Sequence, residues 1–351
     1  MELSASVVVC ARSESVALFR CLESLSGQRP AKGWKLKEIL VVLNKCQPDN
    51  GQGATLKGWQ ESAKASGVEH NVAWEPQRGI PFARNAGMAN ALGAWIAFTD
   101  EDCVVEGNWL MELTATASRA GAHVVAGGWA LVPKSSPSRW VPDGIWGQKS
   151  YEPSGASLIS GSTLQTAYTR NVLFAKPSGV QPGLSKASAT SLLFDETLSE
   201  QGGSDVVFFH HLRLNGARIV FEPSAQVTEI FDGPRLGLTW HFHRRIRNVH
   251  NRLSRAELTG EPVWDILRGA GGTLVALLRL PVLFLALGLA PHSSRASRAV
   301  GKSLLELAKI VGLVTFGLGL RYREYVARWE FLPARKSVLI PREAPISVSS
   351  D

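Results

Sequence analysis

The stretch from Trp95 to Cys103 constrains the fold more than any other part of the chain, because an apolar run ends there in three consecutive acids. The residues before the acids include Ile and Phe and predict a buried strand. In open α/β sheets, ligands bind just beyond the carboxyl ends of the strands. Asp100 and Asp102 are two residues apart, so in extended backbone both point to the same side and can bind one cation. Such oxygen ligands favour Mg²⁺ or Mn²⁺ carrying substrate phosphates, and a solvated acidic loop is the alternative.

Strands and helices alternate over the first hundred residues. The apolar runs predict strands at Ser6–Cys10, Glu38–Leu43 and Asn71–Trp74, in addition to the strand that ends at the acids. Helical patterns lie between them, at Leu18, Leu22 and Leu25 and then at Thr55–Ser66 and Phe82–Leu92. This alternation is typical of βαβ units. We therefore predict an α/β fold with a Rossmann-like, mostly parallel central sheet and flanking helices.

The middle of the chain has a different character. Gly127–Ser162 is rich in Gly, Pro, Ser and Trp and predicts long loops with irregular strands, which in a compact domain are usually functional. A helix is expected at Ser204–Asn215 and strands at Ala217–Glu222 and Ala225–Ile230. Asp205 stands behind two glycines at the start of that helix, where the terminal amides would orient it. An ordinary helix cap is the alternative interpretation of Asp205.

The positive charge of the chain predicts acidic partners. Lys and Arg exceed Asp and Glu by 8, which favours nucleic acid, phosphate-bearing substrates or an anionic membrane surface. Six arginines lie between Arg235 and Arg255, with no acid among them. This segment either closes over a diphosphate or lipid-diphosphate acceptor, or forms a basic helix on anionic lipid. Nucleic acid is not an expected partner, since the arginines adjoin apolar helices and no nucleic-acid module is recognisable.

Two apolar segments follow, at Gly269–Ala290 and Leu304–Leu320. Each is near bilayer-spanning length but carries charge in mid-run, at Arg279 in the first segment. A spanning hairpin would also place the intervening basic residues on the far side, against the positive-inside rule. We therefore expect a re-entrant or interfacial pair at the cytoplasmic face of the (inner) membrane. A soluble helical hairpin and full spanning are the alternatives.

Other chemistries find little support. The four cysteines lack C-x-x-C spacing, which argues against a zinc site and favours a reducing compartment, and no signal peptide is recognisable. Gly51-Gln52-Gly53 lacks the third glycine of a dinucleotide fingerprint, and there is no P-loop. Ser185–Ser191 has no nucleophile elbow, so a serine hydrolase is unsupported.

Several segments, in this order, resemble motifs of the large family 2 of inverting glycosyltransferases, which have the GT-A fold. "FARNAG" is similar to the family's A-R-N-x-G signature and "FTDEDC" to its D-x-D motif. "TRNVLF" resembles the acceptor-side Asn segment, and "FDETLSEQGGSDVVFFHHLRLNGARIVFEPSAQVTE" resembles the stretch bearing the E-D catalytic pair. The resemblance covers roughly residues 4–250 and is strongest to bacterial exopolysaccharide glycosyltransferases with a C-terminal hydrophobic tail.

The resemblance implies roles for individual residues. Asp205 would be the general base that deprotonates the acceptor hydroxyl, and Asp102 and Glu229 would bind Mn²⁺ or Mg²⁺. The residues implied to bind the donor are Ala11, Ser13, Glu14, Asn44, Arg84 and Asp100. Those implied for the acceptor or the diphosphate are Asn171, Trp240, Arg244 and Arg247.

Three positions depart from the family pattern. Leu43 stands where an Asp often reads the nucleotide base, and Ser204 replaces the usual Glu of the catalytic pair. Arg12 and Ser13 replace a frequent Tyr-Asn. These substitutions keep open a non-catalytic, membrane-bound binding or scaffold protein on a GT-A fold as the alternative to an enzyme.

The expected function is metal-dependent, inverting transfer of a sugar from a nucleotide donor. A UDP-sugar is the expected donor, and a lipid-linked or saccharide acceptor in surface-polysaccharide or glycolipid synthesis is the expected acceptor. The expected organisation is a catalytic domain at 1–235, a basic Trp/Arg segment at 236–262, an apolar membrane-associated region at 263–330 and a flexible tail at 331–351.

Overall fold

The computed structural model describes most of the chain. The described residues are 2–44, 54–62, 67–149, 158–177, 192–199, 202–259, 270–290, 292–323 and 328–331. The turn after Asn44, the Gly51–Gly53 segment, the serine-rich segment at 185–191 and nearly all of the predicted tail lie outside these residues.

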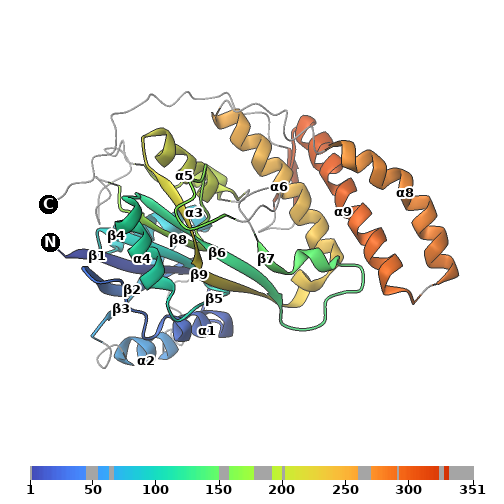
Figure 1. The fold of residues 1–351 in the computed structure, drawn as a ribbon. Helices are drawn as coiled ribbons and strands as arrows, with labels where there is room; N and C mark the ends of the chain where they lie inside the picture. The colour runs from blue at the N-terminus through green and yellow to red at the C-terminus, as the bar shows by residue number, and fades with distance from the viewer. Residues whose placement is uncertain are drawn as a thin grey trace.

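A nine-stranded sheet forms the centre of the molecule (Figure 1). Its strand order is β3-β2-β1-β4-β8-β6-β9-β5, with β7 added beside β6. The bounds are β1 Leu3–Ala11, β2 Trp34–Asn44, β3 Glu69–Glu75, β4 Trp95–Asp100, β5 Cys103–Val105, β6 Val124–Pro133, β7 Gly147–Lys149, β8 Asn171–Ala175 and β9 Ile219–Phe231.

The sheet is mixed, which corrects the expectation of a mostly parallel sheet. The four strands from β3 to β4 pair in parallel, as the βαβ pattern predicts. β8 then runs antiparallel to both β4 and β6, and β5 runs antiparallel to β9. Because β8 is antiparallel to β4, its first residue, Asn171, pairs with Thr99 at the end of β4. The start of β8 therefore lies at the carboxyl edge where the acids are.

Helices cover both faces of the sheet (Figure 1). Buried residues of α1 (Val16–Leu25), α2 (Ala54–Ser62) and α4 (Trp109–Ala120) join one apolar cluster with the sheet. Buried residues of α3 (Ile80–Asn90) and α5 (Ser204–Leu214) join a second cluster on the other face. A buried strand between two helical layers is apolar on both faces, which explains the continuous apolar runs of β1, β2 and β4.

The region from Gly127 to Ser162, predicted as long loops with irregular strands, contains a more regular strand than expected. Its first part belongs to β6, a ten-residue strand inside the sheet that pairs with β8 and β9. The two strands predicted at 217–222 and 225–230 form one strand, β9, with a register shift opposite Gly127 and Gly128. Part of the predicted loop region, 150–157, lies outside the described residues.

Three long helices lie beside the α/β body: α6 (Leu238–Thr259), α8 (Ala270–Leu289) and α9 (Ser294–Gly317). A two-stranded sheet of β10 (Leu320–Arg323) and β11 (Arg328–Phe331) follows them. Figure 1 shows α6 between the body and the α8–α9 pair. His250 of α6 contacts Thr315 of α9, with 2.9 Å between Nε2 and Oγ1. Within the described part of the chain, none of the helices combines the length and apolar character that crossing a bilayer requires.

Candidate active site

Four carboxylate residues lie at the carboxyl edge of the sheet. β4 ends at Asp100, and β5 begins two residues beyond Glu101, where Cys103 pairs with Glu229 of β9. The backbone amide of Ile230 donates to the carbonyl of Asp102 at 3.1 Å. This pairing fixes β9 beside the acidic turn, so Glu229 faces Asp102 although 126 intervening residues separate them in the chain. The structure thus brings the two predicted metal ligands together.

Two arginines neutralise these acids. Arg235 donates from Nη1 to Asp102 and from Nη2 to Glu229, so that one guanidinium bridges both carboxylates. Arg170 donates to the other oxygen of Glu229 at 2.5 Å. Arg170 stands one residue before β8, and the antiparallel pairing of β8 with β4 brings it to the acids. Arg235 begins the basic segment that the sequence predicts near a diphosphate, and Arg170 lies in the "TRNVLF" motif, but the sequence did not assign either one as a partner of the acids.

The pKa values of the carboxyls reflect burial and these partners. Burial raises the pKa of Asp100 to about 6, although the charge of Arg84 opposes the shift. Burial, reinforced by the charge of Glu229, also raises the pKa of Asp102. Glu229 is buried as well, but Arg170 and Arg235 outweigh this effect and hold its pKa below the ordinary value. Ionised carboxylates therefore depend on nearby cations at this edge of the sheet.

The donor set fits a divalent cation that also binds substrate. Asp102 and Glu229 already converge on one cationic group, Arg235, so both can reach a single ion. The described part of the chain has no group of three or more His, Cys, Asp or Glu side chains that could hold a metal. Mg²⁺ is commonly bound by one or two carboxylates, with substrate phosphates and water completing the coordination. Two convergent carboxylates match that pattern and do not match a closed structural metal site.

Asp205 lies at the start of α5, which points toward the same edge. Phe208 and Phe209 of α5 pack on Phe174 of β8, with ring centroids 5.6 and 5.5 Å apart. Aromatic pairs of this kind contribute roughly 0.5–1.5 kcal/mol each beyond area burial, so they fix the helix against the sheet. The Asp205 side chain accepts from the amide of Val206 at 2.9 Å and remains partly exposed.

Arg84 connects this helix to the acidic edge. The buried Arg84 guanidinium donates to Ser204 Oγ at 3.0 Å and lies close enough to Asp100 to lower its pKa. Ser204, the departure from the family's Glu, is thus the hydrogen-bond partner of a motif residue. Arg170 is likewise within electrostatic reach of both Asp100 and Asp205. The predicted donor residue, metal ligand and base therefore share one cluster of charges.

Asn85, the neighbour of Arg84, holds the segment that precedes α5. Its side chain accepts from the amide of Phe194 at 2.9 Å and donates to the carbonyl of the same residue at 3.0 Å. It also donates to Glu196 at 3.2 Å. The Arg-Asn pair of the "FARNAG" motif thus positions the segment that leads to Asp205, in addition to any contact with a donor.

The turn after β1 also reaches the acids. Ala11 is the last, buried residue of β1, and Ser13 is exposed in the turn that follows. The amide of Arg12 lies 3.4 Å from Glu101, and burial raises the pKa of Glu101 to about 7. Glu14 has a buried oxygen, Oε1, with no hydrogen-bond partner among the described residues.

Asn44 lies at the end of β2, but its side chain is occupied. It donates to the carbonyls of Glu75 and Gln77 at 3.2 and 2.6 Å and accepts from the amide of Gly79 at 2.9 Å. These bonds hold the turn before α3. Asn44 therefore positions the "FARNAG" helix, and its side chain has little hydrogen-bonding capacity left for a donor.

The structure corrects the prediction that Asn171 contacts acceptor or diphosphate. Asn171 is fully buried. Its Oδ1 accepts from Trp109 Nε1 at 2.7 Å, and its Nδ2 donates to the carbonyls of Gly128 and Ala225 at 2.6 and 2.7 Å. A buried amide with all these partners ties α4, β6 and β9 together. Its neighbour Arg170 is the residue of this motif that faces the site.

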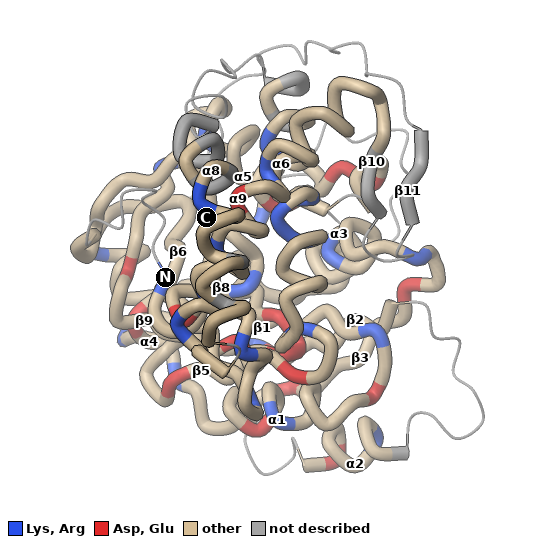
Figure 2. The backbone as a smooth tube through the Cα atoms, turned by 90° about the vertical axis from the view of Figure 1, so that its right-hand side faces the viewer, with Lys and Arg blue, Asp and Glu red and all other residues tan. Residues whose placement is uncertain are grey.

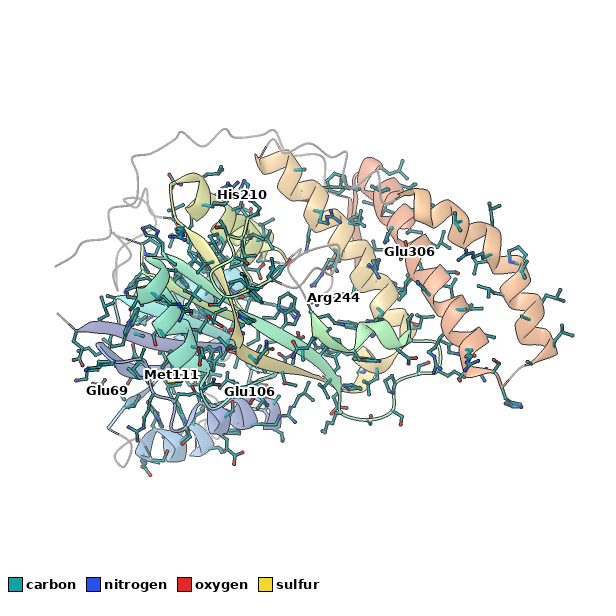
Figure 3. All side chains as sticks on the ribbon, viewed as in Figure 1. Glu69, Glu106, Met111, His210, Arg244 and Glu306 are labelled. Carbon is teal, nitrogen blue, oxygen red and sulfur yellow. The ribbon has the colours of Figure 1, made fainter. Side chains whose placement is uncertain are left out.

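The basic segment forms α6 and packs against the site. Trp240 packs edge-to-face against Phe231, and the guanidinium of Arg244 lies 5.1 Å from the centre of the Trp240 ring. Arg244 is within electrostatic reach of Glu229, and Figure 3 shows it on the side of α6 toward the body. The buried Arg247 lies beside Gly202, in the turn before Asp205. All three predicted residues of α6 thus border the cluster.

His241 of α6 is not placed as a metal ligand. It lies in an aromatic cluster with Trp146 and Phe231, at ring-centroid distances of 5.7 and 6.2 Å. Burial lowers its pKa to about 4, and the nearby arginines add to the shift. The ring is therefore neutral near pH 7, as expected for a packing residue.

Comparison with known proteins identifies the family. A family model described as Glycosyl transferase family 2 matches residues 6–175. The chain is 30% identical over 258 residues to the succinoglycan biosynthesis protein ExoM of Rhizobium meliloti (strain 1021), covering 72% of this chain and 75% of that protein. It is 29% identical over 126 residues to the glycosyltransferase AglE of Haloferax volcanii, covering 35% of this chain and 38% of that protein.

The fold is also similar to a solved structure. GalNAc-T7, solved with UDP, GalNAc and Mn²⁺, superposes with a TM-score of 0.53 at 16% sequence identity. The superposition covers 78% of this chain and 51% of the solved one, so this chain spans about half the length of that neighbour. The likeness supports a GT-A-like α/β fold.

Proposed function

Since the chain belongs to glycosyl transferase family 2 and is a glycosyltransferase, we propose that it transfers a sugar from a nucleotide-diphosphate donor with inversion at the anomeric carbon. The observation that carries this proposal is that Asp102 and Glu229 converge on one cationic group, the Arg235 guanidinium. Asp205 lies at the start of the adjoining helix, α5. Family membership removes the basis for the alternative of a non-catalytic scaffold.

Asp102 and Glu229 would hold Mn²⁺ or Mg²⁺ together with the donor diphosphate. The bound ion would neutralise charge on the departing diphosphate. Asp100 and the turn at Ala11, Ser13 and Glu14 border the same edge and are proposed to contact the nucleotide. The neighbour solved with UDP and Mn²⁺ supports a UDP-sugar donor and a divalent cation.

Asp205 is proposed to act as the base. Its carboxylate accepts the proton of the acceptor hydroxyl, and the oxygen attacks the anomeric carbon from the face opposite the diphosphate. The bond from the anomeric carbon to the diphosphate oxygen breaks as the new bond forms. An Asp is a modest base in water, so most of the effect comes from positioning, which Arg84, Ser204 and the packing of α5 supply.

The acceptor is proposed to be a lipid-linked or saccharide chain in exopolysaccharide synthesis. The likeness to ExoM, named for succinoglycan biosynthesis, supports this assignment. Trp240, Arg244 and Arg247 of α6 border the site and are proposed to contact acceptor or diphosphate. Residues 1–235 would then be the catalytic part, and 236–262 the segment that closes it.

We also propose that the α8–α9 pair lies on the cytoplasmic face of an anionic membrane. Leu278, Leu285 and Leu289 of α8 are 71%, 67% and 81% exposed, an apolar stripe facing away from α9. Arg279, Arg295 and Lys302 are exposed on the same pair of helices, which Figure 2 shows toward the viewer. Apolar and basic side chains together favour an anionic bilayer surface. Sedimentation with anionic vesicles, compared with neutral ones, tests this.

Asp205→Asn tests the proposed reaction. We expect transfer to fall by roughly 10²–10⁴-fold, because the general base is removed, while donor binding is retained. Thermal shifts with a panel of nucleotide sugars and Mn²⁺ measure binding, and product formation measures transfer. If Asp205→Asn also abolishes the thermal shift, Asp205 has a structural role. If no nucleotide sugar binds the wild-type protein with either metal, the proposed function fails.

A further inference from the structure

Arg235 occupies the position in which a divalent cation would lie between Asp102 and Glu229. Its two terminal nitrogens each donate to a different carboxylate, one on the β4–β5 turn and one on β9. The carboxylates in turn raise the pKa of the guanidinium, so it stays charged. The pair of predicted metal ligands therefore already has a cationic partner supplied by the chain itself.

This partner and a metal compete for the same oxygen atoms. Arg235 donates to one oxygen of Asp102 and one of Glu229, and Arg170 donates to the other oxygen of Glu229. A divalent cation that entered beside both arginines would lie next to two positive charges in a partly buried site, which is unfavourable. This conflict is relieved if Arg235 leaves the carboxylates and a diphosphate enters with the metal.

Two nitrogen atoms in the cluster have unused hydrogen-bond donors in the described part of the chain. The Nε atoms of Arg235 and Arg170 are buried and have no hydrogen-bond partner among the described residues. A buried donor without a partner costs about 1–3 kcal/mol, so such groups usually indicate a ligand or water. Phosphate oxygens are good acceptors for a guanidinium group, which often donates two parallel hydrogen bonds to one phosphate.

The Arg235 side chain is partly exposed and lies against two aromatic rings. It extends from the short helical turn Gly233–Leu236, which begins with Gly233 at a left-handed φ of +56°. The side chain is 24% exposed, and its guanidinium lies 3.8 Å from the centre of the Phe231 ring and 5.4 Å from that of Trp240. These aromatic faces support the guanidinium whichever anion it binds, so it can exchange partners by side-chain rotation.

We propose that Arg235 and a divalent cation bind the Asp102–Glu229 pair alternately, and that Arg235, once displaced, binds the diphosphate of the donor. This inference rests on the proposed function for the metal site. It makes Arg235 a residue that weakens metal binding in the absence of donor and strengthens diphosphate binding once the metal is present.

Direct binding measurements on the full chain test the inference without an activity assay. Metal-free protein is titrated with MnCl₂, and free Mn²⁺ is followed by electron paramagnetic resonance. We expect Arg235→Gln to bind Mn²⁺ alone at least ~10-fold more tightly, because the carboxylates are no longer occupied. For inorganic pyrophosphate added to the Mn²⁺-loaded protein, we expect Arg235→Gln to bind ~10-fold more weakly.

Three further variants make the result decisive. Arg235→Lys keeps one charge but cannot bridge two carboxylates as a planar fork, so its Mn²⁺ affinity should lie between those of wild type and Arg235→Gln. Lys134→Gln is the matched control, since Lys134 forms an exposed pair with Asp232 at 2.8 Å near this turn and should bind as wild type does. Asp102→Asn should abolish Mn²⁺ binding. Thermal unfolding confirms that each variant is folded.

The outcomes separate the inference from the proposed function. If Asp102→Asn abolishes Mn²⁺ binding but Arg235→Gln binds Mn²⁺ no more tightly than wild type, the alternation is wrong and the metal site stands. If pyrophosphate affinity is unchanged in Arg235→Gln, the role in diphosphate binding is wrong. If Asp102→Asn binds Mn²⁺ as wild type does, the proposed metal site fails and the inference fails with it.

Discussion

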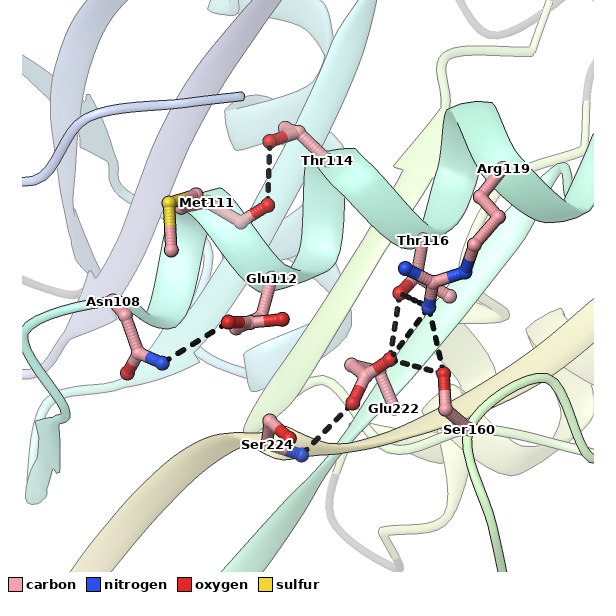
Figure 4. A network of polar contacts seen from close by, with 9 residues as sticks. All are labelled: Asn108, Met111, Glu112, Thr114, Thr116, Arg119, Ser160, Glu222 and Ser224. Atoms are coloured by element: carbon pink, nitrogen blue, oxygen red, sulfur yellow. Dashed lines mark hydrogen bonds and ion pairs between the residues drawn. The ribbon is translucent and has the colours of Figure 1, made fainter. Parts of the chain in front are cut away.

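Two buried glutamates on β9, seven residues apart, have opposite surroundings. Glu222 accepts from the hydroxyls of Thr116 and Ser160 at 2.6 and 2.5 Å, from the amide of Ser224 at 3.0 Å and from Arg119 at 3.2 Å (Figure 4). Among the described residues, Glu229 has two arginine partners, Arg170 and Arg235, and it shares Arg235 with Asp102.

The difference distinguishes a structural carboxylate from one suited to a ligand. Glu222 has a full set of donors, which are mostly neutral groups, and in the described part of the chain no second acid shares them. Glu229 lies opposite the carboxylate of Asp102. A cation must therefore neutralise the pair whether or not substrate is present, and that cation can be exchanged for another. A satisfied network stabilises one arrangement, whereas a shared cation allows exchange.

The largest expected effect is on activity and separates the two glutamates. Glu229→Gln should lower turnover of the nucleotide sugar by roughly 10²–10³-fold, because one of the two proposed metal ligands loses its charge. Glu222→Gln, the matched control on the same strand, should leave turnover of the folded protein unchanged. Steady-state kinetics with Mn²⁺, with folding checked by circular dichroism, measures both.

Equal losses of turnover in the two variants would contradict the distinction. A normal turnover in Glu229→Gln, with a normal dependence on Mn²⁺ concentration, would remove Glu229 from the metal site and leave Asp102 without its proposed partner.

A second expected effect is on stability. Glu222→Gln should lower the free energy of unfolding by about 1–3 kcal/mol, because the buried hydroxyls of Thr116 and Ser160 lose a charged acceptor. Urea denaturation of the metal-free protein measures it. A loss below about 0.5 kcal/mol would show that the network of Figure 4 is replaceable, and Glu222 would no longer serve as the structural member of the comparison.

The sequence predicts the four parallel strands from β3 to β4 better than the rest of the sheet, in which β6 pairs in parallel with β9 and antiparallel to β8. Buried parallel strands are apolar throughout, so β1, β2 and β4 appear as continuous runs. β6 is harder to predict, because Gly127 and Gly128 interrupt its apolar pattern and favour loops with irregular strands. A Cβ at these two positions would come within 2.3 Å of Asn171 and 2.1 Å of Gln226, so the strand needs glycine for a tertiary reason. Local propensity does not reveal such a requirement.

Prediction of the site is limited in the same way, because local sequence does not reveal contacts between distant residues. Asp100, Asp102 and Asp205 lie in motifs, and the structure brings them to one edge. Arg235 was recognised only as the start of a basic segment, because its partner Asp102 is 133 residues away in the chain. Arg170 would have been found from its position beside Asn171, had the antiparallel register of β8 with β4 been known.

The smallest expected effect is on the pH dependence of stability. As the pH rises, Glu222 and Asp100 should change the stability of the fold in opposite directions. Burial opposes ionisation of Glu222, but hydrogen bonds from Ser160, Thr116 and Ser224 outweigh it and lower its pKa. Glu222 therefore stabilises the fold above its ordinary pKa of 4.5 and loses this contribution as the pH falls. Asp100 has a pKa raised from 3.8 to about 6, so the folded state holds its proton more strongly than the unfolded state.

Asp100 should therefore make metal-free protein less stable as the pH rises from about 4 to 6, and the penalty should persist above that range. For a partly buried group this amounts to about 1–3 kcal/mol, and Asp100→Asn should remove it. Urea denaturation in EDTA at pH 5 and 7.5 measures the effect in wild type and Asp100→Asn. Glu222→Gln is the control, since Glu222 titrates below pH 5, the lower of the two measured values. If Asp100→Asn loses as much stability with rising pH as wild type does, another group causes the loss. In that case Asp100 is not the carboxyl that the cations at this edge neutralise.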